Sequence, residues 1–300
     1  MKKSTIIWIC IAAGLCIAGL IVALVGLFMM SFDFKDADFP KYDEKSYQVS
    51  GDFNKISIDT ETSDVIFVRS QDGVCRVDCS EIKRLTYSVY VEDGTLTIEK
   101  NDSRKWYDHI TIFNFTRTMT VHLPAEKYDA VVINSTTGDV SVPEDFSFSS
   151  AKVELTTGDI KWGAQVSEEL SAKTTTGDIS VSGISPKKLD VKASTGQITL
   201  SDIKCESAKL KSTTGDNKLK NVVAKALNIE SSTGDITLRD CDGESISVKT
   251  TTGDVEAALL SGKNFSTSTS TGNVRVPSDS EGGSCRIETT TGDIRVKIAE

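Results

Sequence analysis

The stretch Ser135-Thr136-Thr137-Gly138-Asp139-Val140 decides the fold, because a Thr-Gly pair like the one at its centre occurs nine times at nearly constant spacing. The glycines, 19 or 20 residues apart, are Gly138, Gly158, Gly177, Gly196, Gly215, Gly234, Gly253, Gly272 and Gly292. Aspartate follows seven of them, at Asp139, Asp159, Asp178, Asp216, Asp235, Asp254 and Asp293, whereas Gln197 and Asn273 follow the other two. Repetition at this period predicts a stacked repeat architecture.

Apolar residues alternate with polar ones on both sides of each corner. In one copy they are Leu170 and Ala172 before the corner and Ile179 and Val181 after it, with a further apolar residue at Ile184. This period of two is typical of strands with one buried face. The same parity predicts that the threonine just before each glycine also points inward.

A single coil of this length cannot bury its apolar face alone, so the coils must stack and pair their strands in parallel. At a strand spacing of about 4.8 Å, nine coils make a rod about 43 Å long. Glycine permits the positive φ of a sharp corner, and the following aspartate is expected to bond nearby backbone N–H groups. The sequence therefore predicts an all-β, single-stranded β-solenoid of about nine 19–20-residue coils.

Stacking would place the corner carboxylates in a ladder. Neighbours about 4.8 Å apart would repel by about 1 kcal/mol in water, unless hydrogen bonds or shared cations offset the repulsion. A calcium ladder is the alternative interpretation of the seven aspartates. Calcium prefers six or more oxygen ligands, whereas each corner offers one carboxylate. We therefore interpret the aspartates as structural and predict no metal, cofactor or catalytic residue.

The N-terminus predicts a membrane anchor. Lys2 and Lys3 precede an uncharged apolar run over residues 6–30. Its helix would measure about 37 Å, enough to cross a hydrocarbon core of about 30 Å. The run is longer than a signal peptide and lacks a small-residue cleavage site. Basic residues before it and Asp33 and Asp36 after it predict a single-pass cell-membrane protein with a cytoplasmic N-terminus and an extracytoplasmic solenoid.

A cap is expected between the span and the repeats. Ser63 takes the glycine place in a degenerate first coil, and Asp93-Gly94 joins two alternating runs as a hairpin turn. The expected organisation is a cytoplasmic tail (1–5), a transmembrane helix (6–30), a linker (31–46), the degenerate coil and hairpin cap (47–130) and the repeat solenoid (131–300). No C-terminal cap is visible after Gly292, so the open last coil could accept another molecule, including a second copy.

The cysteines do not predict a disulfide framework. Cys75 and Cys79 would lie about 13 Å apart on one strand face, too far to bridge each other. We interpret them as buried apolar residues. The alternative, a zinc site completed by His109 and His122, matches no standard zinc spacing.

The segments Thr120-Val121-His122-Leu123-Pro124, Asp129-Ala130-Val131-Val132-Ile133 and Ser135–Val140 resemble a bacterial family of domains of unknown function called "putative adhesin", which includes LiaG-like envelope-stress proteins. The resemblance covers roughly residues 47–300. It implies an N-terminal span followed by a β-solenoid in the cell envelope, and it brings no catalytic residues.

These features favour a non-enzymatic binding or scaffold protein, adhesin-like or associated with envelope stress, whose partner is a cell-wall glycopolymer or an envelope protein. Lys173, Lys192 and Lys211 form a predicted strip for anionic polymers. Glu154 and Glu230 flank this strip, so a solvated face is the alternative. The net charge of −9 argues against nucleic acid.

Two further functions fit the sequence less well. A polysaccharide-processing β-helix enzyme is the alternative function, but it needs a cleft with convergent acid and base groups, and the array has no irregular loops to build one. Ice binding would need a flat hydroxyl face. The inward threonines expected from parity leave only one outward Ser/Thr column for it.

Overall fold

The computed structural model describes residues 14–16, 18–21, 43–82, 84–104, 117–278 and 281–299. Residues 1–41 and 42–300 are separate compact units. In the first, residues 14–16 and 18–21 are helical, and the rest of the expected span lies outside the described residues. No helix in the described part of the chain is long and apolar enough to cross a membrane.

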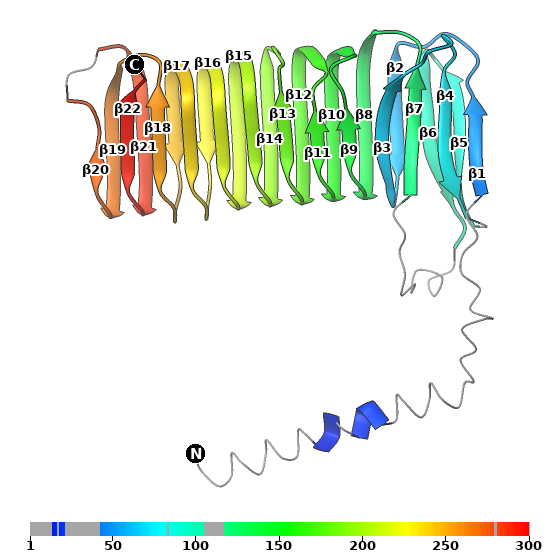
Figure 1. The fold of residues 1–300 in the computed structure, drawn as a ribbon, viewed down its shortest axis with the longest axis horizontal. Coiled ribbons are helices and arrows are strands. Elements are labelled where there is room, and N and C mark those ends of the chain that lie inside the picture. The colour runs from blue at the N-terminus through cyan, green and yellow to red at the C-terminus, as the bar shows by residue number, and fades with distance from the viewer. Residues whose placement is uncertain are drawn as a thin grey trace. The chain divides into compact units, whose positions relative to one another are not determined.

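The second unit is an all-β solenoid whose coils stack along one axis (Figure 1). Its cap strands are β1 (Asp43–Gln48), β2 (Lys55–Thr60), β3 (Ser63–Arg69), β4 (Arg76–Glu81), β5 (Leu85–Glu92), β6 (Thr95–Asp102) and β7 (Arg117–Leu123). Its repeat strands are β8 (Lys127–Thr137), β9 (Val140–Val142), β10 (Ser147–Thr157), β11 (Ile160–Trp162), β12 (Gln165–Thr176), β13 (Ile179–Ser182), β14 (Lys188–Thr195), β15 (Ile198–Thr214), β16 (Asn217–Glu230), β17 (Ile236–Lys249), β18 (Val255–Leu259), β19 (Lys263–Thr271), β20 (Val274–Arg275), β21 (Gly283–Thr291) and β22 (Ile294–Ile298).

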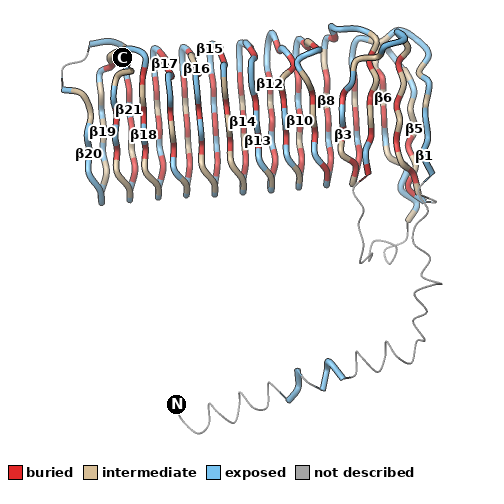
Figure 2. Tube along the Cα trace, viewed as in Figure 1, coloured by how far each residue is buried: buried red, intermediate tan, exposed pale blue. Residues whose placement is uncertain are grey.

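Parallel pairing in strict register confirms the predicted solenoid. Ile160 pairs with Val140 on one neighbouring coil and with Ile179 on the other. The predicted inward columns on both sides of the corner are buried in every coil except that of Gly272, and they form one continuous core along the rod (Figure 2). Trp162 and Phe148 fill the core of an early coil, with ring centroids 5.7 Å apart. Because every coil covers its neighbour's apolar face, the rod lengthens coil by coil without widening its core.

Two features require glycine at the corner, a positive φ and a close approach to the neighbouring coil. At Gly177 φ is +140°, a conformation open to glycine alone, and an added Cβ would lie 2.1 Å from the Gly158 carbonyl oxygen of the preceding coil. The other repeat glycines show the same close approach. Ser63 occupies the equivalent place below Gly138, whose Cβ would meet the Ser63 carbonyl oxygen at 2.4 Å.

A second corner, which the sequence analysis did not identify, follows six residues after several of these glycines. Gly183, Asp202, Asn221 and Asp240 occupy it with φ between 53° and 70°. Glycine, asparagine and aspartate are the residues that tolerate this left-handed conformation. Asn221 Nδ2 donates a hydrogen bond of 2.7 Å to Asp202 Oδ1, so these corners are also linked between coils.

The orientation expected for the corner threonines is wrong. The threonine before each repeat glycine is exposed, and so is the Ser or Thr before it. The last inward position lies three residues before glycine, as at Thr174, where Oγ1 donates to the Gly158 carbonyl oxygen at 3.0 Å. Leu155 and Ala193 are buried at the same position, so strand alternation ends there with or without a hydroxyl, and the next two residues are exposed. Two exposed hydroxyl columns therefore run along the corner edge.

The cap extends both sheets of the solenoid. Strand β6 pairs in parallel with β2 and antiparallel with β5, which confirms the predicted hairpin. Strand β7 pairs in parallel with β3, and β4 and β1 continue antiparallel beyond it. The Tyr87 hydroxyl lies 2.8 Å from Thr60 Oγ1 and 2.9 Å from Ser63 Oγ. These buried hydrogen bonds join the hairpin to the first coil.

The last two coils are stacked out of sequence order. Strand β21 lies between β17 and β19, and β22 lies between β18 and β20 (Figure 1). The Gly292 coil thus stacks on Gly253, and the Gly272 coil is outermost. The expectation that the open coil is the last one in sequence is wrong. Val274 on β20 is 42% exposed, whereas Ile294 on β22 is fully buried.

Candidate binding surfaces

The corner aspartates form a ladder of hydrogen bonds between coils. Asp159 N donates to Asp139 Oδ1 at 2.8 Å, and Asp178 N donates to Asp159 Oδ1 at 2.7 Å. The same contact joins the later aspartates and ends at Asn273 on the outermost coil, whose N–H donates to Asp293 Oδ1 at 2.8 Å. The bonds therefore run to the next coil, not within the local turn as expected from the sequence.

These bonds explain how the ladder tolerates its own charge. Each carboxylate faces a backbone N–H, and the backbone hydrogen bond from Asn273 lowers the pKa of Asp293, with Arg295 assisting. At Gln197 the ladder changes, because that side chain bonds Thr199 and Lys218 instead. Over the described residues, no group of three His, Cys, Asp or Glu side chains is placed to hold a metal ion. The geometry thus gives the calcium alternative no support.

The predicted lysine strip is aligned but largely neutralised. Lys173, Lys192 and Lys211 stand side by side in register. However, Lys192 Nζ lies 2.8 Å from Asp190 Oδ2, and Lys211 Nζ lies 3.6 Å from a Glu230 carboxylate oxygen. The structure places all three on the sheet before the corner, with Glu154 and Glu230 at the two ends of the strip.

Cys75 and Cys79 lie in the core, as the apolar interpretation predicted. Cys75 and Cys79 are buried free thiols, and burial raises the pKa of each to about 12. His122 Nε2 lies 3.0 Å from Asp78 Oδ2. His122 belongs to the outward face of β7, whereas both thiols lie on the buried face of the sheet. His109 lies outside the described residues.

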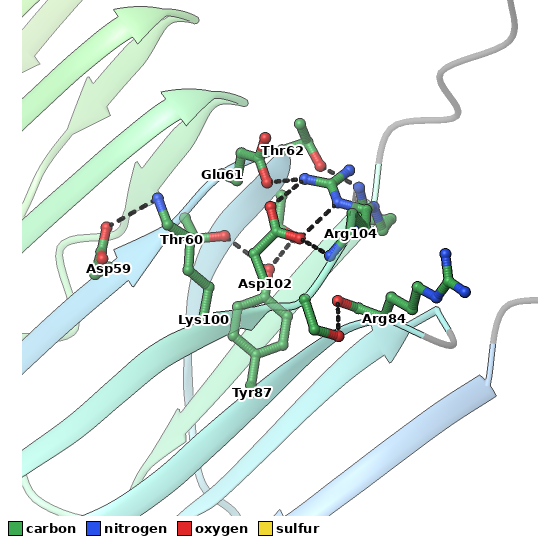
Figure 3. Close-up of polar contacts among 12 residues, drawn as sticks. Asp59, Thr60, Glu61, Thr62, Arg84, Tyr87, Lys100, Asp102 and Arg104 are labelled. Atoms are coloured by element: carbon green, nitrogen blue, oxygen red, sulfur yellow. Dashed lines mark hydrogen bonds and ion pairs between the residues drawn. The ribbon is translucent and has the colours of Figure 1, made fainter. Parts of the chain in front are cut away.

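A polar cluster ties the cap hairpin to the first coil (Figure 3). The Arg104 guanidinium bonds Glu61 and lies 2.8 Å from Asp102 Oδ2, and hydrogen bonding to Asp102 raises the pKa of Arg104. Lys100 Nζ pairs with Asp59 Oδ1 at 3.5 Å. Each charge is matched by a neighbour, so this cluster is an internal clamp.

A groove of about 660 Å³ is lined by residues that follow the second corner in successive coils, such as Lys187, Lys204 and Val223. Its walls carry alternating charges, with Lys187 Nζ 2.7 Å from Glu168 and Lys225 Nζ 3.6 Å from Glu206. Buried Lys263 lies at one end and pairs with Asp242 at 2.5 Å. The groove is therefore close to neutral.

A second hollow of about 620 Å³ lies on the sheet after the corner, near the outermost coils. Its charged lining consists of Arg239, Asp240, Glu256, Arg275, Arg295 and Lys297. Arg295 is held in place by Asp254, Glu256 and Asp293, at 3.5, 3.6 and 2.5 Å respectively. The four cations that line this hollow outnumber its two acids.

Comparisons with known proteins agree with this geometry. A family model described as Toastrack DUF4097 matches residues 53–216 and 185–300. The chain belongs to the Toastrack family. This confirms the resemblance to the "putative adhesin" domains, because a structural neighbour of the chain carries that name.

Two of these neighbours have solved structures that span nearly the whole Toastrack solenoid. A "putative adhesin" from Parabacteroides distasonis is 13% identical with a TM-score of 0.50, over 85% of this chain and 97% of that chain. A "putative adhesin" from Bacteroides fragilis is 18% identical with a TM-score of 0.45, over 86% and 97%. At such identities the likeness concerns the fold alone. No curated protein matches the sequence.

Sequence reasoning missed the cations of the second hollow on this Toastrack solenoid. Arg239 and Lys297 occupy equivalent positions, five residues after their corner glycines, so the repeat alignment contained their column. Their proximity was hidden because it depends on the exchanged order of the last two coils. In sequence order, the Gly272 coil would lie between the Gly253 and Gly292 coils, which are adjacent in the structure.

Proposed function

We propose that the protein is a non-enzymatic binding or scaffold module of the bacterial cell envelope. The observation that supports this most directly is the rigid display of outward side chains. In-register pairing holds each column at the coil spacing, and the corner aspartates bond one coil to the next. Such a surface suits recognition of a partner that repeats along its own length. The names of the structural neighbours point the same way.

The membrane anchor belongs to the same proposal. Residues 6–30 would span the bilayer as a helix, with Lys2 and Lys3 in the cytoplasm and the solenoid outside. A membrane-impermeant amine reagent applied to intact cells should modify the exposed Lys173 and Lys225 and spare Lys2 and Lys3. Modification of Lys2 and Lys3 without that of the solenoid lysines would contradict the orientation.

The partner we favour is a glycopolymer of the cell wall, with an envelope protein as the other outcome. The full-length chain, purified in neutral detergent, should be retained on isolated cell walls and released by raised salt. Addition of EDTA should change nothing, because the corner carboxylates bond backbone N–H groups. Failure to bind walls with or without calcium would contradict the glycopolymer and favour capture by an envelope protein.

A further inference from the structure

The sheet after the corner carries two outward columns of residues near the outermost coils. Three residues after the corner glycines, the spatial order is Lys218, Thr237, Glu256, Arg295 and Arg275. Five residues after them, the order is Lys220, Arg239, Ala258 and Lys297. Six cations thus face outward over five adjacent coils, with Glu256 as the only acid within the two columns.

The second column leaves a gap at its centre. Ala258 separates Arg239 from Lys297, so two long cationic side chains flank a small floor. Two coil spacings put their backbones roughly 10 Å apart. The 620 Å³ hollow opens at this place, and both cationic residues are exposed. An anionic group over Ala258 would be within reach of both.

These cations are available for a ligand. No acidic side chain in the described parts of the chain lies within ion-pair distance of Lys220, Arg239 or Lys297. Arg295 is already held by three carboxylates, so it supports the floor of the patch more than it adds free charge. Uncompensated cations are unusual on a chain with a net charge of −9, because most of its surface repels anions.

From this arrangement we infer a binding site for a phosphate-bearing linear polymer, seated over Ala258 between Arg239 and Lys297 and running along the rod axis. The inference rests on the proposed binding function and names its ligand class. Arginine's planar fork donates to two phosphate oxygens at once and the lysine adds a point charge, so one phosphate can be held by both cations. Cations over five coils cover about 19 Å, so several phosphates of one chain can be contacted together.

The experiment measures binding of the full-length chain, in neutral detergent, to linear inorganic polyphosphate. The test variant is Arg239→Ser with Lys297→Ser. The matched control is Lys192→Ser with Lys211→Ser, which removes the same charge from the neutralised strip. Each lost contact should weaken binding about fivefold, so the test variant should bind roughly 25-fold more weakly and the control less than threefold. Unfolding midpoints should match across all three proteins.

A second variant, Ala258→Glu, places an acid on the floor and should abolish binding without removing a cation. Polyglutamate should bind more weakly than polyphosphate, and affinity for polyphosphate should fall with salt, less steeply in the test variant. Equal losses in test and control variants would overturn the inference, as would binding to vesicles of anionic phospholipid without binding to polyphosphate. Unchanged wall retention by the test variant would overturn this site while leaving the proposed function standing.

Discussion

Substituting alanine for Gly177 tests whether close stacking of the corners holds the rod together. Gly177 and Gly183 belong to one coil and both have positive φ, +140° and +70°. A Cβ on Gly177 would lie 2.1 Å from the Gly158 carbonyl oxygen and 2.9 Å from Asp159 Oδ1. A Cβ on Gly183 would meet nothing within 4 Å. The pair therefore separates the cost of φ from the cost of close approach.

The magnitude follows from what must move. A non-glycine residue at the φ of Gly177 costs about 1–3 kcal/mol. To relieve the contact, the coils must separate at this corner and weaken two hydrogen bonds, from Gly158 N to Thr176 O and from Asp178 N to Asp159 Oδ1, at about 1 kcal/mol each. Gly177→Ala should lower the free energy of unfolding by about 3–5 kcal/mol. Gly183→Ala should cost about 1 kcal/mol, and Gly183→Asn less, because asparagine tolerates the left-handed conformation.

Denaturant unfolding of the full-length chain in neutral detergent, followed by far-ultraviolet circular dichroism, gives the comparison. Because repeat rods can unfold in segments, amide hydrogen exchange should accompany it. Exchange should accelerate at the corners next to Gly177 in its variant and stay unchanged in the Gly183 variants. Equal destabilisation by the two alanine substitutions would refute the reasoning, since the clash would then contribute nothing.

Three further predictions concern the end of the rod. Cysteines replacing Ser245 and Ser284, whose hydroxyls lie 3.2 Å apart, should form a disulfide, whereas cysteines replacing Ser245 and Asn264 should not; peptide mass spectrometry distinguishes them. Burial raises the pKa of Cys285 to about 11, so a thiol reagent should modify it only after unfolding. Burial alone would raise the pKa of Asp242, but hydrogen bonds, led by the one from Lys263, lower it overall. The stability that the ionised Asp242 contributes should therefore be lost as the pH falls through this lowered pKa.

Each of these has a defined contrary result. A disulfide between positions 245 and 264 would show that the coils stack in sequence order. Rapid modification of Cys285 in the native protein would show that β21 is not enclosed. For the acid effect, the Asp242→Asn variant is the control, because it lacks the titrating group. If it loses stability with pH as steeply as the parent, the Lys263 contact does not contribute.

Much of the fold could be predicted because the repeat fixes it locally. A column such as Ile160, Ile179 and Ile198 is visible in one sequence, since glycine spacing aligns the copies and strand alternation gives their burial. The orientation of Thr176 could not be read this way, because parity fails where the backbone bends. The second corner could have been predicted from the column Gly183, Asp202 and Asn221, because all three residue types tolerate a positive φ.

The candidate site was less predictable, because it depends on contacts between coils. Repeat counting aligned the lysine strip correctly. It could not predict the ion pairs with Asp190 and Glu230, because these depend on how the side chains are placed. The basic hollow requires the exchanged coil order, which no period in the sequence encodes. Repeat alignment predicts which residues share a column, and it leaves open which coil is the neighbour.

The exchanged order itself has a physical reason. The outermost coil is covered on one side only, so its inward residues stay partly in contact with water. Five residues before its corner glycine, the Gly272 coil has Thr267, whereas the Gly292 coil has the fully buried Ile287. Leaving this isoleucine half exposed would cost about 1 kcal/mol, so the coil with threonine at this position is favoured at the end. The same exchange places Lys297 beside Ala258, so the coil order that keeps Ile287 buried also assembles the basic hollow.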